Sequence, residues 1–194
     1  MINNVDKIRP MLSFEDKDDF YFVQVLKRRK DNPNMEKDMV LLNNFYIDSL
    51  ENFNKKLPFI KWVCDSENAR AYFRLNKRNY KDLTPHMVKR VVEIAFGNDC
   101  HALKNVFDSV AGEFHSDSDK KWLIDIDNDK HIAYGGLLDE VTRLQIEAGR
   151  ESMTELLPTK NGVHLITRPF NLIKFKVMFL VDVHKDANTI LYIP

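Results

Sequence analysis

The sequence contains little of what marks a secreted, zinc-binding or membrane protein. It has only two cysteines, Cys64 and Cys100, and their spacing fits no zinc motif. We therefore expect reduced thiols in a core and a cytosolic compartment. No apolar stretch is long enough to span a bilayer, and the first residues lack the apolar run of a signal peptide. These absences predict a cytoplasmic protein without a membrane partner.

An excess of charge is also missing, because Lys and Arg total 29 and Asp and Glu total 29, which gives a formal net charge of zero. This balance argues against a protein that coats nucleic acid by bulk charge. It is compatible with a local basic groove that faces an acidic site. Hydrophobic residues make up 44% of the 194 residues. That content is enough for a core, and the length fits one domain or one domain with a small annex.

The first half of the chain predicts a mixed α/β module over residues 1–118. The expected strands are 20–26, 59–64 and 70–76, and the expected helices are 35–53, 84–96 and 100–114. Thr84 followed by Pro85 is typical of a helix start. Helical spacing of apolar residues predicts the buried stripe of this helix, formed by Val88, Val91, Val92 and Ala95.

Two basic segments in this module each have two interpretations. Arg70, Tyr72 and Arg74 share one face of the expected strand 70–76. This face is either an exposed edge with cation–π packing or a surface for phosphates and a stacked base. The run 27–30, Lys-Arg-Arg-Lys, is either a solvated turn or a phosphate contact.

The second half predicts a split βαβ arrangement, as in ferredoxin-like and RRM-like domains. Its expected elements alternate as strand, helix, strand, strand, helix and strand, over residues 122–127, 137–148, 153–157, 163–167, 170–179 and 189–193. Asn161-Gly162 is a strong signal for a hairpin between the two middle strands. The expected fold class is therefore α+β, with an N-terminal α/β module followed by a ferredoxin/RRM-like βαββαβ catalytic half. The second half covers residues 119–194, and the two halves form one compact unit.

Two carboxylates lie on one face of the expected strand 122–127, because Asp125 and Asp127 are two residues apart. Neighbouring unpaired carboxylates on an apolar strand are costly, and a divalent cation removes that cost. The alternative is a strand end that runs into a solvated turn. In the split βαβ topology the first and third strands are neighbours, so both carboxylates are expected beside His164 on the face opposite the helices.

Cations flank this histidine. Lys160 precedes it and Arg168 follows it, and Gly162 would let a ligand approach the backbone closely. Acids for a metal and cations for phosphate on adjacent strands are the groups that nucleotidyl transfer requires.

Residues 121–194 resemble the catalytic core of the archaeo-eukaryotic primase (primase-polymerase) superfamily. Asp125-Ile-Asp127 is similar to its Asp-x-Asp metal motif. Gly162-Val-His164 is similar to its small-residue-x-His motif for the incoming nucleotide. Asp182 is similar to the acid of the third motif, for which Asp186 is an alternative. Unlike many members, these 194 residues contain no zinc-binding cluster and no helicase domain.

The resemblance implies a metal-dependent nucleotidyltransferase of DNA replication that binds a nucleoside triphosphate and a single-stranded template. Mg²⁺ or Mn²⁺ would be held by Asp125, Asp127 and Asp182. The triphosphate would be held by His164, Lys160 and Arg168, and nucleic acid would be contacted by Arg70, Tyr72 and Arg74. Two alternatives stay open: a non-catalytic RRM-like module that binds nucleic acid, and a metal-dependent nuclease that uses the same acids.

Overall fold

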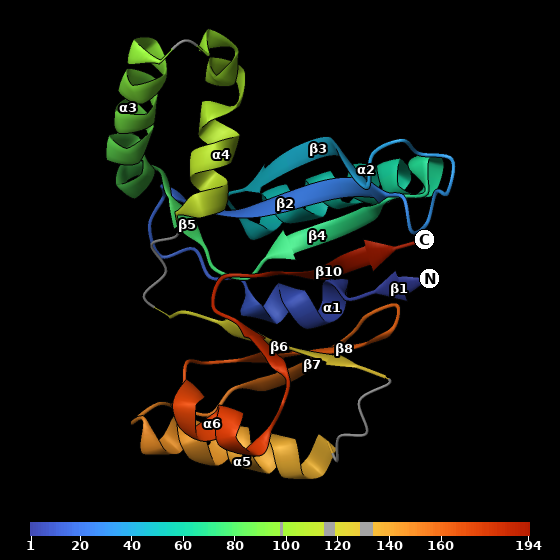
Figure 1. The fold of residues 1–194 in the computed structure, drawn as a ribbon, viewed down its shortest axis with the longest axis vertical. Helices are drawn as coiled ribbons and strands as arrows, with labels where there is room; N and C mark the ends of the chain where they lie inside the picture. The colour runs from blue at the N-terminus through green and yellow to red at the C-terminus, as the bar shows by residue number, and fades with distance from the viewer. Residues whose placement is uncertain (98, 115–118, 129–133) are drawn as a thin grey trace.

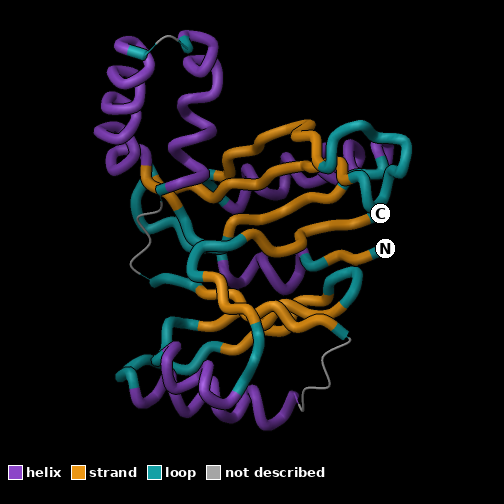
Figure 2. Tube along the Cα trace, in the orientation of Figure 1, coloured by secondary structure: helices purple, strands orange, loops and turns teal. Residues whose placement is uncertain are grey.

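The fold, obtained as a computed structural model, is described for residues 1–97, 99–114, 119–128 and 134–194 (Figures 1 and 2). The strands are β1 Ile2–Asn3, β2 Asp19–Arg28, β3 Met39–Ile47, β4 Arg70–Arg74, β5 Arg78–Asn79, β6 Trp122–Asp127, β7 Thr154–Pro158, β8 Gly162–Thr167, β9 Asp182–His184 and β10 Asn188–Ile193. The helices are α1 Val5–Ile8, η1 Arg9–Met11, α2 Leu50–Glu67, α3 Tyr80–Phe96, η2 Cys100–Asn105, α4 Val106–Glu113, α5 Tyr134–Glu147 and α6 Leu172–Met178. None of the helices described is long and apolar enough to cross a membrane.

Two antiparallel sheets organise the chain. The first has the order β1-β10-β4-β2-β3, with β5 paired to β2, and the second has the order β7-β8-β6-β9. The α+β class predicted from the sequence is confirmed. The predicted boundary between residues 118 and 119 adjoins residues 115–118, which lie outside the described part of the chain.

The first sheet confirms two predicted strands and corrects two other predictions. Strands β2 and β4 lie where 20–26 and 70–76 were expected. The helix expected over 35–53 is wrong, because β3 occupies the middle of that range, Met39–Ile47, and pairs along nearly the whole of β2. The strand expected over 59–64 is also wrong. It lies within α2, which begins after Ser49, whose hydroxyl accepts a hydrogen bond from the backbone N–H of Asn52 at 3.1 Å.

The helix expected over 84–96 exists, but it begins earlier and faces differently. Its N-cap is Asn79, whose side chain accepts a hydrogen bond from the backbone N–H of Lys81, and Pro85 lies inside the helix. With α4 it forms an arm that projects from the first sheet (Figure 1). The predicted buried stripe is wrong, because an arm has too little neighbouring structure to cover it. Its valines are exposed at 59%, 41% and 48%, in the order Val88, Val91 and Val92.

The second sheet has the strand order of a split βαβ fold, since the first strand β6 lies between β8 and β9 and the second strand β7 forms an edge. Helices α5 and α6 lie together against one face of this sheet (Figure 1). The fourth strand was assigned wrongly to 189–193. It is the three-residue β9, whereas β10 joins the first sheet between β1 and β4. The burial of β10 agrees with its place in the first sheet. Four consecutive residues of β10 are buried, as expected for a strand inside a sheet that is covered on both faces.

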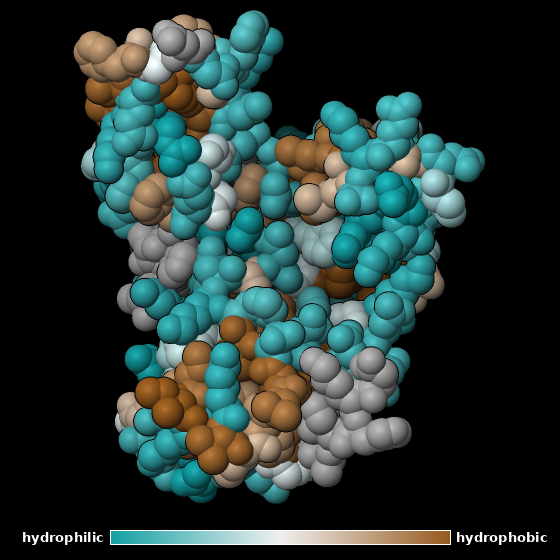
Figure 3. All heavy atoms as spheres, in the orientation of Figure 1, coloured by the Kyte–Doolittle hydropathy of each residue, from teal (hydrophilic) through white to brown (hydrophobic). Residues whose placement is uncertain are grey.

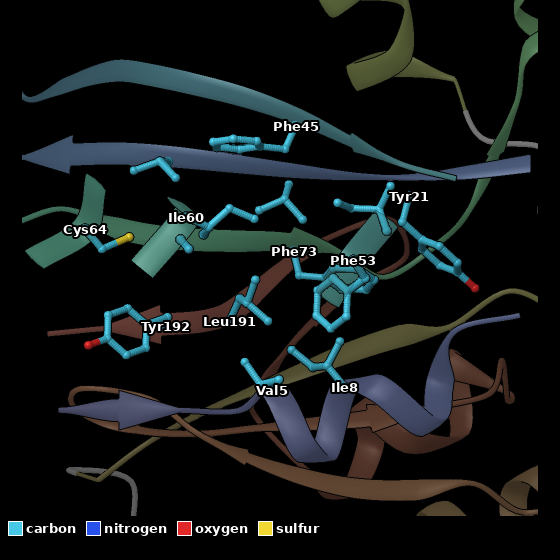
Figure 4. Packing of buried hydrophobic residues seen from close by; sticks show 14 of the residues in the cluster. Val5, Ile8, Tyr21, Phe45, Phe53, Ile60, Cys64, Phe73, Leu191 and Tyr192 are labelled. Carbon is cyan, nitrogen blue, oxygen red and sulfur yellow. The ribbon is translucent and has the colours of Figure 1, made fainter. Parts of the chain in front are cut away.

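The largest core cluster lies between the two sheets. It contains Val5 and Ile8 of α1, Phe73 of β4, and Leu123 and Ile166 of the second sheet. Figure 4 shows Val5 and Ile8 of α1 on the side of the cluster opposite Phe45 of the first sheet. The face of the second sheet away from α5 and α6 is therefore partly covered by the first half of the chain.

A polar clamp also joins the halves. The fully buried Asn76 accepts a hydrogen bond from the backbone N–H of Lys121 at 2.6 Å and donates to its carbonyl oxygen at 3.1 Å. It also donates to Asp186 Oδ1 at 3.2 Å. Arg78, equally buried, donates to the second carboxylate oxygen of Asp186 at 3.0 Å. These contacts fix the β9–β10 connection against the end of β4.

Candidate functional site

The strand register brings three predicted site residues side by side. Asp125 on β6 is paired with His164 on β8 and with Asp182 on β9. Directly opposed residues of antiparallel strands project to the same face. Asp127 is two residues further along β6 and so projects to that face as well. This face is the one turned away from α5 and α6, as the sequence predicted.

His164 has a hydrogen-bonding partner at one ring nitrogen and a neighbouring carboxylate near the other. Its Nδ1 lies 3.0 Å from Thr189 Oγ1 of β10, and its Nε2 lies 3.6 Å from Asp125 Oδ1. Burial lowers the pKa of His164 below its usual value, Asp125 opposes this effect, and His184 adds to it. The imidazole is therefore biased toward the neutral form, in a fixed orientation beside the carboxylate.

His184 belongs to the same face, because it is paired with Leu123 two residues before Asp125. From the sequence alone, a histidine at this position is equally compatible with a ligand and with a surface residue. The signal that could have placed it is the alternation of Asp182 and His184, once β9 is recognised as a strand.

The acids are accessible. The Asp125 side chain is 39% exposed, and Asp127 and Asp182 are classed as exposed residues. Within the described ranges, none of the three forms an ion pair with Lys or Arg. No group of three or more His, Cys, Asp or Glu residues in that part of the chain is already placed to hold a metal ion. The donor chemistry fits a hard cation such as Mg²⁺ or Mn²⁺, but the carboxylates would have to move closer together.

Asp186, the alternative third acid, has a different position. It accepts hydrogen bonds from Asn76 and Arg78 in the polar clamp, and Arg74 Nη1 lies 3.7 Å from its Oδ2. Its charge is therefore already matched by internal donors. Of the two candidates, only Asp182 is paired with Asp125 on the sheet.

The two predicted phosphate-binding cations are at opposite ends of β8. Lys160, in the turn before β8, donates to Asp31 Oδ1 at 2.7 Å. Arg168, just after β8, lies 3.0 Å from Glu151 Oε2 and 3.1 Å from Asp119 Oδ1. Arg168 is six positions beyond Gly162, which is about 20 Å along an extended strand. The structure therefore does not bring Arg168 and Lys160 together.

Gly162 serves the sheet itself. A Cβ atom at this position would lie 2.1 Å from the backbone oxygen of Ile126 on β6. The sequence suggested that Gly162 leaves room for a ligand near the backbone. In the structure, the absence of a side chain at Gly162 leaves room for the neighbouring strand β6.

The predicted nucleic-acid contacts have internal partners. Arg70 makes a bidentate ion pair with Asp31, at 2.6 and 2.8 Å, and is buried. Tyr72 accepts a hydrogen bond from Arg28 at 3.1 Å. Arg74 lies near Asp186, and β4 runs between β10 and β2, so the exposed-edge interpretation is wrong.

A cleft lies where β6 ends. Its volume is about 490 Å³, and it is lined by Lys30, Asp127, Asn128, Lys160 and Asn161. From the sequence, Lys30 was singled out only as part of the basic run 27–30. Nothing near that run in the sequence indicates which segment of the second half lies beside it. The view in Figure 3 shows hydrophilic residues between the apolar surface of the second half and the sheet above it.

Comparisons with known proteins gave no match, either to family models, to curated proteins or to solved structures. The resemblance to the primase superfamily therefore depends on three short motifs and on the strands that carry them.

Proposed function

We propose that this protein is a primase-like, metal-dependent nucleotidyltransferase that binds a nucleoside triphosphate and a single-stranded nucleic acid. The observation that carries the proposal is the position of Asp125, paired in register with His164 on one side and Asp182 on the other. These groups face away from the helices of the second half, beside a cleft that contains two lysines. Positioned charge of this kind accounts for most of the catalysis in phosphoryl transfer.

Asp125, Asp127 and Asp182 would hold Mg²⁺ or Mn²⁺, since carboxylates are the ligands that hard cations prefer. A bound metal would neutralise negative charge on the phosphates and on the group being transferred. In the described part of the chain no lysine or arginine is paired with these acids, so no internal cation has to leave first.

His164 would bind a phosphate oxygen. In the neutral imidazole one nitrogen carries the proton and the other accepts a hydrogen bond. If the Thr189 hydroxyl donates to Nδ1, the proton is on Nε2, which lies on the side of Asp125. His164 would then donate a hydrogen bond to the triphosphate beside the metal ligands.

The experiment is nucleotide binding by isothermal titration calorimetry, with NTP or dNTP, in Mg²⁺, in Mn²⁺ and in EDTA. The double variant Asp125→Asn/Asp127→Asn should lose the metal-dependent part of the affinity, by about tenfold or more. Asp139→Asn removes an exposed carboxylate from α5 of the same half and should bind like the wild type. Unchanged nucleotide affinity in the double variant would remove the basis of the proposal.

The same acids would also serve a nuclease, and an assay with a primed template separates the two. Lengthening of the primer on addition of nucleotides supports transfer, and shortening without nucleotides supports hydrolysis. A simple RRM-like binding module has less support. Leu123, Leu157 and Ile166 of its sheet face are buried in the core between the halves, where bases would otherwise stack.

A further inference from the structure

Lys30 is the only residue of the first half that lines the cleft beside Asp127, among the residues that the structure describes. It follows β2, whereas the other lining residues come from the end of β6 and the β7–β8 turn. Two further hollows, of about 300 and 450 Å³, also include Lys30 in their lining. We infer that Lys30, together with Lys160, binds the outer phosphates of a nucleotide polyphosphate in this cleft.

The backbone around Lys30 is held in place. The backbone N–H of Asp31 donates to the carbonyl oxygen of Arg28 at 3.0 Å, and that of Arg29 donates to Asp38 at 2.9 Å. The side chain of Asn68 donates to the Asp31 carbonyl oxygen at 2.9 Å. A cation on a preorganised turn loses less conformational freedom when it binds an anion.

Lys30 also differs from its neighbours in the basic run. Lys27 is paired with Glu67 at 3.1 Å, Arg28 donates to Tyr72 at 3.1 Å, and Arg29 lies 3.4 Å from Asp38. In the same described stretch, Lys30 has no hydrogen bond or ion pair. Of the four cations, Lys30 is the one whose charge is available to a ligand.

Lys160, which also lines the cleft, supplies a second ammonium group. It donates to Asp31 Oδ1 at 2.7 Å, which uses one of its three N–H donors. The remaining donors can reach a phosphate without breaking that ion pair. The two lysines come from different halves of the chain, so a ligand between them would also join the halves.

The carboxylate of Asp127 indicates that the bound anion carries a metal ion. A carboxylate in the cleft repels a bare phosphate, but it attracts a phosphate that carries a divalent cation. The cleft therefore suits a polyphosphate–metal complex, with the metal on the Asp127 side and the outer phosphates on the lysine side. This assignment rests on the proposed function for the metal, whereas the contact with Lys30 can be tested separately.

The test uses inorganic tripolyphosphate as the probe, in isothermal titration calorimetry with the full chain, once with Mg²⁺ and once with EDTA. Lys30→Ala should weaken binding in Mg²⁺ by about tenfold, as expected for the loss of one charge-assisted contact. Lys30→Arg should keep most of the affinity. Lys37→Ala is the matched control, because Lys37 is an exposed lysine of the same β2–β3 connection that lines none of the three hollows.

Equal affinities for Lys30→Ala and Lys37→Ala would overturn the inference. Thermal unfolding of Lys30→Ala should match that of the wild type, since this side chain has no partner in the described structure. A Lys30 effect that persists equally in EDTA would support the phosphate contact while contradicting the metal chemistry. If Mg²⁺ strengthens binding but Lys30→Ala does not weaken it, the metal chemistry is supported and the phosphate contact of Lys30 is contradicted.

Discussion

Asp31 links one cation from each half of the chain. It accepts hydrogen bonds from Arg70 of β4 and from Lys160 of the β7–β8 turn. Its side chain is only 8% exposed. The bonds from Arg70 lower the pKa of Asp31 from 3.8 to about 2, and Lys160 contributes to the same effect. An ion pair that fixes Lys160 in this way also fixes one wall of the cleft.

A depressed carboxyl pKa makes stability depend on pH. Ionised Asp31 stabilises the fold fully above the unfolded value of 3.8, and this contribution is lost as the pH falls through the folded value of about 2. The contribution is roughly 2 kcal/mol at neutral pH. The difference in unfolding free energy between the wild type and Asp31→Asn should therefore narrow by about this amount between about pH 4 and pH 2, in urea titrations.

Asp38→Asn is the control for this titration. Asp38 lies 3.4 Å from Arg29 and its side chain is 90% exposed, so its loss should change stability little at any pH. A difference between wild type and Asp31→Asn that stays constant down to the acid limit would contradict the assignment.

Gly162 gives a second prediction at the scale of one residue. Gly162→Ala places a Cβ where the backbone oxygen of Ile126 already lies, so β6 and β8 must separate. We expect a loss of about 1–3 kcal/mol in unfolding free energy by chemical denaturation, as for other overpacked sites. Gly135→Ala in α5 meets nothing within 4 Å, and alanine favours a helix, so this control should be neutral or slightly stabilising. Equal stability of the two variants would show that the strands tolerate the separation.

At the scale of elements, apolar spacing identified elements well only where a second layer covers them. Aromatic and β-branched residues predicted the position of β2, and alternation predicted that of β4, because both strands lie against the core. The residues of β3 also repeat at intervals compatible with a helix, and only their pairing with β2 decides in favour of a strand. Local spacing cannot report a partner that lies elsewhere in the chain.

For α3, the sequence correctly predicted a helix but wrongly predicted which of its residues are buried. Val88→Gln/Val92→Gln should change the unfolding free energy by less than about 0.5 kcal/mol, because both valines are largely exposed. Leu83→Ala in the same helix should cost about 2–5 kcal/mol, since Leu83 is 2% exposed within a cluster that includes Val106 and Val110. Denaturation curves of both variants check this contrast. Similar losses would indicate that the arm folds back on another surface.

At the scale of the whole molecule, the sequence predicted the class and the topology of the second half but not how the halves meet. Periodicity and turn signals located β6, β7 and β8, and so placed Asp125 beside His164. They could not show that β10 leaves the second half, because its apolar residues suit either sheet. The clamp by Asn76 and the pairing of Lys160 with Asp31 could not be predicted from the sequence either, because both are contacts between segments that are distant in the chain.

A core shared by both sheets predicts that the two halves unfold together. Trp122 in a Trp62→Phe background reports on the second half by fluorescence. Cys64 in a Cys100→Ser background reports on the first half by thiol labelling, because burial raises the pKa of Cys64 to about 12 and keeps it unreactive while folded. Both signals should change at the same urea concentration, as expected for one cooperative transition. Two separate midpoints would mean that the cluster between the sheets contributes little.

The position of β10 has a consequence for synthesis on the ribosome. The first sheet lacks a strand between β1 and β4 until residues 188–193 have left the exit tunnel. Until then, the nascent first half exposes unpaired strand edges, and its core cluster lacks Leu191 and Tyr192 of β10. Unpaired edges of this kind promote incorrect pairing between chains. The chain therefore completes its first sheet with a strand that is synthesised after every strand of the second sheet, so the first half cannot finish folding before β10 has emerged.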